Sequence, residues 1–266
     1  MIKIKALACS VALVAIVLTK LYSSSNVETA QKGTNPVAWE FDKKQKVEAT
    51  EDSTERDSYW SDVTFAEEEV PLDDPAVKNK LTTYLKRFSY KKIQSYKMHR
   101  KADEYLPRIA AILASYGIPD DFKYIPVVES DLDPKTSSHK GAGGYWQFIP
   151  STARLYGLRV NAQVDDRLNL DKSTHAAAKY LKYLYNQFGD WTLVAAAYNV
   201  GGGSLKRSIR RQGTESYYAL NLNRETGSYV YKLISVKSVI ENPDRFGYRR
   251  LAKADTETQT AANGML

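Results

Sequence analysis

The sequence predicts an all-α fold. Apolar residues recur at helical spacing in several segments, and a glycine follows many of these segments, as is common after the last turn of a helix. No segment alternates apolar and polar residues over the length of a strand, and no helical repeat of fixed period is visible. A chain of 266 residues, of which 43% are hydrophobic, can bury one sizeable core. We therefore expect one helical domain with appendages.

The first 25 residues have the composition of an export signal. Lys3 and Lys5 precede an apolar run from Ala6 to Leu18, and Lys20 and small residues follow it. The run is shorter than the roughly 20 residues of a membrane span, which favours a cleaved signal peptide and leaves a retained anchor open. The only cysteine, Cys9, lies in this leader, so a disulfide framework is excluded. We expect an exported protein of the periplasm or cell envelope, with membrane association through the N-terminus as the alternative.

Residues 26–75 are predicted to form an acidic linker, because they have little periodicity and few aliphatic side chains. Scattered aromatic residues, Phe65 among them, leave docking of this segment onto the domain open. The helical domain is placed at residues 76–250, and residues 251–266 are expected to be a polar tail.

Helices are expected in order along the domain, at about 75–88, 96–116, 151–156, 172–188, 190–199, 204–211 and 225–241. Asp74, Asp171 and Asp190 lie at the starts of three of these segments and are the predicted N-cap residues. Pro107 lies inside the second segment, where it is expected to bend the helix or to begin a new one.

Glu129 is the candidate catalytic acid. It follows the apolar stretch YIPVV at 124–128 and precedes a polar, glycine-rich loop. Apolar surroundings disfavour the ionised form of a carboxyl and raise its pKa, which keeps a glutamate protonated near neutral pH. On local features alone, such a glutamate is more often a solvated charge or the partner of a nearby Lys or Arg.

Five spaced motifs surround this acid: Glu129-Ser130 with Ser138, GAGGYWQFIPSTA at 141–153, YGL at 156–158, AAYNVG at 196–201, and Glu225-Thr226 with Tyr229. In this order they resemble the lytic transglycosylases of the soluble-lytic-transglycosylase type, and most closely the membrane-bound lytic murein transglycosylase D branch. The resemblance runs from about Tyr96 to Tyr248.

The resemblance implies a lysozyme-like helical domain with a long substrate groove. It also implies a peptidoglycan lytic transglycosylase, a lyase in which Glu129 protonates the glycosidic oxygen and then, as carboxylate, takes the proton of the C6 hydroxyl of N-acetylmuramic acid. By the same carry-over, Ser138 binds the sugar near the scissile bond, Gln147 binds an N-acetyl sugar, and Tyr198 orients the acid. Tyr145 either stacks against a sugar or packs beneath the loop, and Tyr229 completes the matched site residues.

The formal net charge of +7 favours anionic surfaces or polymers as partners. Nucleic acid is not expected for an exported chain, whereas peptidoglycan glycan strands carry peptide stems with carboxylates. His99, His139 and His175 have no metal-ligand spacing, and neither a metal nor a cofactor is expected. The glycine-rich loop lacks the lysine and hydroxyl of a phosphate-binding loop, and is predicted to let backbone approach a ligand.

Two alternatives remain: a hydrolytic muramidase on the same kind of fold, and a non-catalytic wall-binding protein. A hydrolase of the usual kind needs a second carboxyl near the scissile bond. Asp131 and Asp133 are close in sequence to Glu129 but are predicted to be turn residues. Glu225 is the third acid that could supply this group.

Overall fold

The computed structural model describes residue 60 and residues 63–248 of the chain. The predicted signal peptide or anchor at 1–25, most of the predicted linker and the predicted tail at 251–266 lie outside these residues. Among the helices that the structure describes, none combines the length and the apolar character that a membrane crossing requires. The described residues from Thr64 onward belong to one compact unit.

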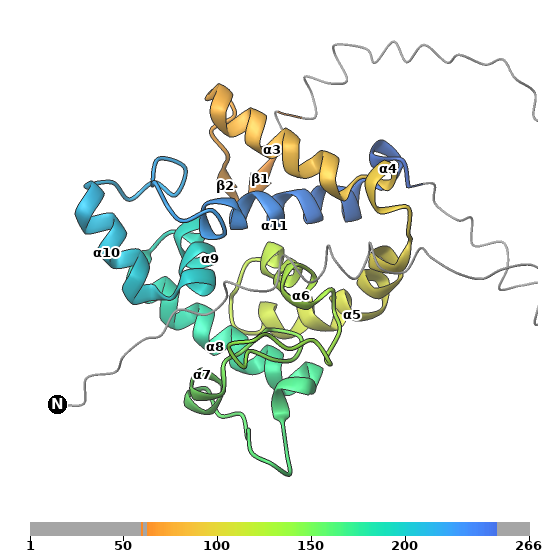
Figure 1. Ribbon diagram of the computed structural model, residues 1–266, viewed down its shortest axis with the longest axis vertical. Helices are drawn as coiled ribbons and strands as arrows, with labels where there is room; N and C mark the ends of the chain where they lie inside the picture. Colours follow the sequence, from red (N-terminus) through yellow and green to blue (C-terminus); the bar gives the residue numbers. More distant parts are fainter. Residues whose placement is uncertain (1–59, 61–62, 249–266) are drawn as a thin grey trace, which may run out of the picture. The chain divides into compact units, whose positions relative to one another are not determined.

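The described chain is mostly helical, which confirms the all-α prediction (Figure 1). A short hairpin, β1 (Thr64–Phe65) and β2 (Glu68–Glu69), precedes the helices. They are α3 (Pro75–Phe88), α4 (Tyr90–Ile93), α5 (Lys97–Ala114), α6 (Ile125–Ser130), α7 (Pro150–Leu155), α8 (Leu170–Phe188), α9 (Trp191–Val200), α10 (Gly202–Gln212) and α11 (Thr226–Glu241). Single 3-10 turns lie at η1 (Asp120–Tyr124), η2 (Asp166–Leu168) and η3 (Asp244–Phe246).

Helix α11 is the centre of the packing. Most of its residues are buried on every side, which is typical of a helix enclosed by other elements. It packs against α3, α9, α6 and η1, and Figure 1 shows α3 running along one side of it. A second layer is formed by α8, which packs against both α5 and α9. The short helix α6, which carries Glu129, therefore lies directly against the buried central helix.

Local signals placed most helix boundaries well. The side chains of Asp74 and Asp190 accept hydrogen bonds from the first turns of α3 and α9, as predicted. The prediction for Asp171 is wrong, because Asn169 has the extended backbone of a cap and accepts from the Lys172 N–H. Asp171 lies in the first turn of α8 instead and pairs with Arg108 of α5.

Helix α5 continues through Pro107, so the two halves of the predicted segment form one helix and no new helix begins there. The four-residue helix α4 was not expected from the sequence. Helix α10 begins at Gly202, two residues before the predicted start, because Gly201 alone makes the turn after α9 with φ +85°.

The hairpin lies within the segment predicted to be a linker, and it is packed against the helices. The Phe65 ring is buried, 5.6 Å from that of Phe122. The Ala66 N–H donates to the Asp121 carboxylate at 2.7 Å. The Glu68 carboxylate accepts from the backbone N–H groups of Trp191 and Thr192, at 2.6 and 2.9 Å. These N–H groups lie at the start of α9, where an anion is favourable.

Candidate active site

Glu129 lies in the last turn of α6, with only 5% of its surface exposed. The helix is short because Pro126 lies in its first turn and Asp131 ends it in the left-handed conformation, with φ +53°. Its apolar residues Ile125 and Val127 are buried, and so is Glu129. The predicted candidate acid is therefore an interior side chain rather than a solvated charge at a helix end.

The direct partner of Glu129 comes from the central helix. The Tyr229 hydroxyl donates to Glu129 Oε1 at 2.6 Å. Tyr229 is itself buried within α11, so its ring cannot swing away without opening the core. The resemblance named Tyr229 as a site residue but gave it no task, and the structure shows it holding the candidate acid.

Burial raises the pKa of Glu129 to about 7, because an ionised carboxylate loses its hydration there. The negative charge of Glu225 raises this pKa further, whereas the Tyr229 hydrogen bond and the Lys232 ammonium lower it. A carboxyl with a pKa near the working pH can both donate and accept a proton at useful rates. The site thus has the proton chemistry that a single acid–base residue needs.

Ser130, the neighbour of Glu129, joins α6 to the glycine-rich loop. Its buried hydroxyl lies 2.9 Å from the Pro126 carbonyl oxygen within the helix and 2.9 Å from the Tyr145 carbonyl oxygen in the loop. The serine of the Glu-Ser pair thus connects α6, the helix that carries the candidate acid, to the loop at 136–148.

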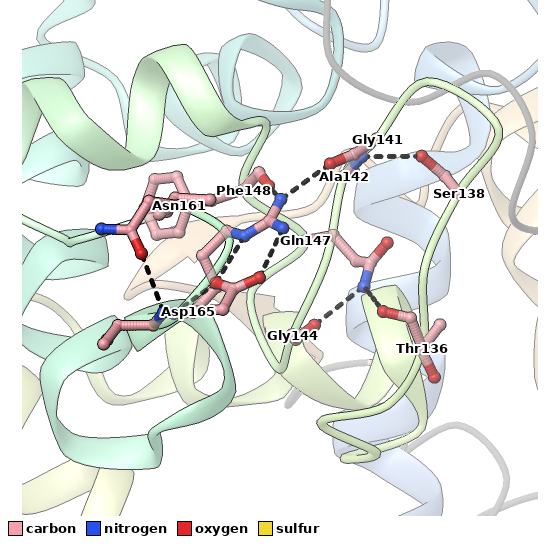
Figure 2. Close-up of polar contacts among 12 residues, drawn as sticks. Thr136, Ser138, Gly141, Ala142, Gly144, Gln147, Phe148, Asn161 and Asp165 are labelled. Carbon is pink, nitrogen blue, oxygen red and sulfur yellow. Dashed lines mark hydrogen bonds and ion pairs between the residues drawn. The ribbon is translucent and has the colours of Figure 1, made fainter.

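The loop at 136–148 is tied together by its own polar groups. Figure 2 shows the Gln147 amide between the carbonyl oxygens of Thr136 and Gly144, to which Nε2 donates at 2.9 and 2.8 Å. Ser138 Oγ accepts from the Ala142 N–H at 3.0 Å. Both predicted sugar-binding side chains therefore also shape the loop, and Gln147 is buried rather than a surface amide.

Arg167 clamps this loop from outside, and sequence reasoning did not single it out. Its Nη1 donates to the carbonyl oxygens of Gly141 and Phe148, at 2.7 and 2.8 Å. Its Nε and Nη2 donate to the two carboxylate oxygens of Asp165, at 2.9 and 2.7 Å. In Figure 2, dashed lines mark the contacts that end on the Asp165 carboxylate and on the carbonyl groups of Gly141 and Phe148. The residues next to Arg167 in the sequence do not predict that its side chain binds this loop.

Two glycines allow this close approach. A Cβ on Gly144 would lie 2.0 Å from the Arg167 carbonyl oxygen, and a Cβ on Gly143 would lie 3.1 Å from its guanidinium carbon. Gly144 also has φ +76°, which side chains rarely adopt. The backbone approach that we expected toward a ligand is, at these two glycines, an approach to Arg167.

The aromatic candidates pack within this loop or against it. The Tyr198 hydroxyl donates to the Trp146 carbonyl oxygen at 2.7 Å, so this bond goes to the loop, whereas the hydroxyl on Glu129 is that of Tyr229. The Trp146 indole is fully buried, and its N–H donates to Thr174 at 3.0 Å. The Tyr145 ring lies 5.8 Å from that of Tyr105.

The other acids have different environments. Asp131 caps α6 and pairs with Lys101, and Asp133 accepts from the Lys135 N–H, as expected of turn residues. Glu225 is the acid whose charge acts on Glu129, and its Oε1 lies 3.4 Å from Asn199 Nδ2. Within the described residues, no group of three or more His, Cys, Asp or Glu side chains is arranged to hold a metal ion.

Comparison with known proteins identifies the domain. Residues 108–221 match the family described as "Transglycosylase SLT domain". Membrane-bound lytic murein transglycosylase D of Escherichia coli (strain K12) is 33% identical over 185 residues, which are 68% of this chain and 40% of that protein. A putative tributyltin chloride resistance protein of Alteromonas sp. is 29% identical over 147 residues, covering 54% of this chain and 71% of that protein. The chain thus spans less than half the length of the first relative.

The 70 kDa soluble lytic transglycosylase from Escherichia coli is similar in structure, with a TM-score of 0.45 and 19% identity over 62% of this chain and 29% of that one. The resemblance drawn from the motifs is confirmed, and the lysozyme-like helical fold that it implied agrees with the family match. The chain therefore contains a transglycosylase SLT domain and is homologous to membrane-bound lytic murein transglycosylase D.

Proposed function

We propose that this protein is a peptidoglycan lytic transglycosylase that cleaves the β-1,4 bond between N-acetylmuramic acid and N-acetylglucosamine. The observation that carries the proposal is the state of Glu129 within an SLT domain. It is a buried carboxyl with a pKa of about 7 that a tyrosine hydroxyl holds in one orientation. The names of the E. coli relatives, lytic murein transglycosylases, support the same substrate.

The reaction follows from a single acid–base group. Protonated Glu129 gives its proton to the glycosidic oxygen, and the bond from that oxygen to C1 of the muramic residue breaks. The carboxylate that remains accepts the proton of the C6 hydroxyl, whose oxygen forms the new bond to C1. The product is a 1,6-anhydromuramic end, and no water is consumed. Because the nucleophile is part of the substrate, its attack is unimolecular and avoids much of the entropic cost of recruiting water.

The loop at 136–148 is proposed to form one wall of the substrate groove, where Ser138, Gln147 and Tyr145 contribute to sugar binding and Tyr198 holds the loop through the Trp146 carbonyl oxygen. Tyr229 is proposed to stabilise the carboxylate of Glu129 after proton transfer, because a hydroxyl that donates to a carboxylate favours the charged form. We place the enzyme in the cell envelope, on the predicted export signal at 1–25 and on the membrane-bound E. coli relative.

Hydrolysis is the second candidate, because Glu225 is a carboxyl whose charge acts on Glu129. If Glu225 activated water on the opposite face of the sugar, the product would be a reducing muramic end. The two functions therefore differ in product.

Purified sacculi digested with the full chain test both functions. Mass analysis of the released muropeptides should show anhydro ends that borohydride does not reduce. Glu129→Gln removes the transferable proton while keeping shape, and it should lower the rate by at least ~100-fold with the fold intact. Mostly reducible new ends would establish the hydrolytic function, and a folded Glu129→Gln variant of wild-type activity would refute the assignment of the acid.

A further inference from the structure

A second carboxyl, that of Glu225, lies on the face of α11 that reaches the proposed acid. Glu225 immediately precedes α11 and has helical backbone angles, and Tyr229 and Lys232 follow it at positions i+4 and i+7. Residues at this spacing project from one side of a helix. Tyr229 donates to Glu129, so the side of α11 that carries Glu225 and Lys232 is turned toward α6.

Only one oxygen of the Glu225 carboxyl has a hydrogen-bond partner among the described residues. Asn199 Nδ2 lies 3.4 Å from Oε1, and Asn199 Oδ1 accepts from the Thr226 hydroxyl at 2.8 Å, so α9 orients both groups at the start of α11. The other oxygen, Oε2, is buried and accepts no hydrogen bond from the described residues. Burying a carboxylate oxygen that has no hydrogen-bond donor costs free energy. Hydrogen bonds therefore compensate the charge of Glu225 only in part.

The charged groups around the two acids come from several elements. Lys232 of α11 acts on both acids, and Lys140 of the loop acts on Glu225. Both ammonium groups and the Asn199 amide favour the charged form of Glu225 against the effect of burial, which raises its pKa. The positive charges of Arg87 of α3 and of Arg224 disfavour the charged form of Lys232.

We propose that Glu225 is a positioning residue that acts through Glu129, its carboxylate opposing loss of the proton from Glu129 until the glycosidic oxygen accepts that proton. Lys232, on the same side of α11, has the opposite effect to Glu225 on the Glu129 proton. The two charges together set the pH range in which Glu129 is protonated. The inference rests on the proposed role of Glu129. Because Glu225 transfers no proton in this scheme, its removal should shift the working pH without abolishing the reaction.

The test is the pH profile of muropeptide release from sacculi. Glu225→Gln removes a like charge, so the alkaline limb should move to lower pH by roughly half to one unit, a loss of about 3- to 10-fold at alkaline pH with little change at acidic pH. Lys232→Gln removes an opposite charge and should move the limb to higher pH. Glu215→Gln, which changes an exposed acid in the loop after α10, is the matched control and should leave the limb in place.

Opposite shifts from the two variants are a result that a merely structural loss does not produce. An unmoved limb in Glu225→Gln, or shifts of both variants in the same direction, would overturn the inference. A folded Glu225→Gln variant that is inactive at every pH would also overturn it, because Glu225 would then be required for the reaction itself.

Direct titration of the Glu129 carboxyl by carbon NMR separates this inference from the proposed function. Its midpoint should fall in Glu225→Gln and rise in Lys232→Gln. An unchanged midpoint, together with loss of activity in Glu129→Gln, would refute the role of Glu225 alone. A shifted midpoint in a protein whose activity survives Glu129→Gln would refute the proposed function.

Discussion

The Tyr229 hydroxyl donates a hydrogen bond of 2.6 Å to Glu129 Oε1, and this contact joins residues 100 positions apart in the sequence. Both side chains are buried, and they come from the central helix α11 and the short helix α6. The contact connects the core of the domain to the proposed catalytic acid. Packing in α11 therefore sets the orientation of the carboxyl.

Replacing Tyr229 by Phe should impair catalysis with little effect on the fold, because the ring stays and only the hydroxyl is lost. A hydrogen bond to a charged group contributes about 1.5–3 kcal/mol, which corresponds to a rate loss of roughly 10- to 100-fold. The bond also lowers the pKa of Glu129, so the alkaline limb should move to higher pH. Rates of muropeptide release measured across pH would show both effects.

Tyr231→Phe is the matched control for this variant, since Tyr231 lies on the same helix and its hydroxyl does not contact Glu129. Equal activity of the two variants would show that the hydroxyl of Tyr229 has no part in the reaction.

The raised pKa of Glu129 predicts a stability difference between wild type and Glu129→Gln. The folded protein favours the neutral carboxyl, so its stabilising contribution is complete below the unfolded pKa of 4.5 and is lost as pH rises toward about 7. The glutamine variant has no such loss. Urea unfolding should give similar free energies at acidic pH and an advantage for the variant on the order of 3 kcal/mol at about pH 8.

A constant difference in the free energy of unfolding across pH would show that burial does not perturb this carboxyl. Such a result would remove the electrostatic basis of the proposed acid while leaving its position unchanged.

Arg167→Lys should weaken substrate binding. Lysine keeps the charge but cannot reach two carbonyl oxygens and Asp165 at once, so the loop at 136–148 loses its clamp. We expect KM on soluble glycan fragments to rise more than kcat falls. Arg159→Lys is the control, because Arg159 pairs with Asp166 and is largely exposed. A change confined to kcat, or equal changes in both variants, would contradict a role of the clamp in loop geometry.

Gly144→Ala should be among the most damaging substitutions in the loop. Its Cβ would lie 2.0 Å from the Arg167 carbonyl oxygen, so backbone must move. Gly157→Ala is the control that measures the cost of positive φ alone, because Gly157 also has positive φ but has open space around it. Thermal unfolding should show a larger loss for Gly144→Ala, by at least ~1 kcal/mol. Equal losses would mean that the loop can yield without displacing Arg167.

Glu68→Gln should destabilise the domain although it lies far from Glu129 in sequence. The carboxylate accepts from two N–H groups at the start of α9, whereas a glutamine amide has one acceptor oxygen, so one N–H loses its partner at a cost of about 1 kcal/mol. Glu69→Gln, which changes the exposed neighbour, is the control and should unfold like wild type. Denaturant midpoints compare the two, and an unchanged midpoint for Glu68→Gln would exclude a capping role for the hairpin.

The order of these elements was predictable because helix ends depend on residues within one turn. Asp74 and Asp190 cap α3 and α9 through bonds to nearby backbone N–H groups. The same reasoning failed for Asp171, because two neighbouring residues can both cap and the choice depends on backbone angles. The hairpin escaped prediction because its strands are too short to show alternation, and its stability comes from contacts with Asp121 and α9.

The sequence alone determined the class of fold, because apolar periodicity is a local property, and it singled out Glu129 as the candidate acid through the five ordered motifs around the apolar stretch. Only the tertiary structure decided what surrounds that acid. Tyr229 and Glu225 reach the site from α11, and Arg167 holds the loop by bonds to backbone carbonyl groups that any sequence provides. The separation of two residues along the sequence does not predict their distance in space once the chain folds back on itself. The pKa of Glu129 is set by burial and by charges that only folding brings together.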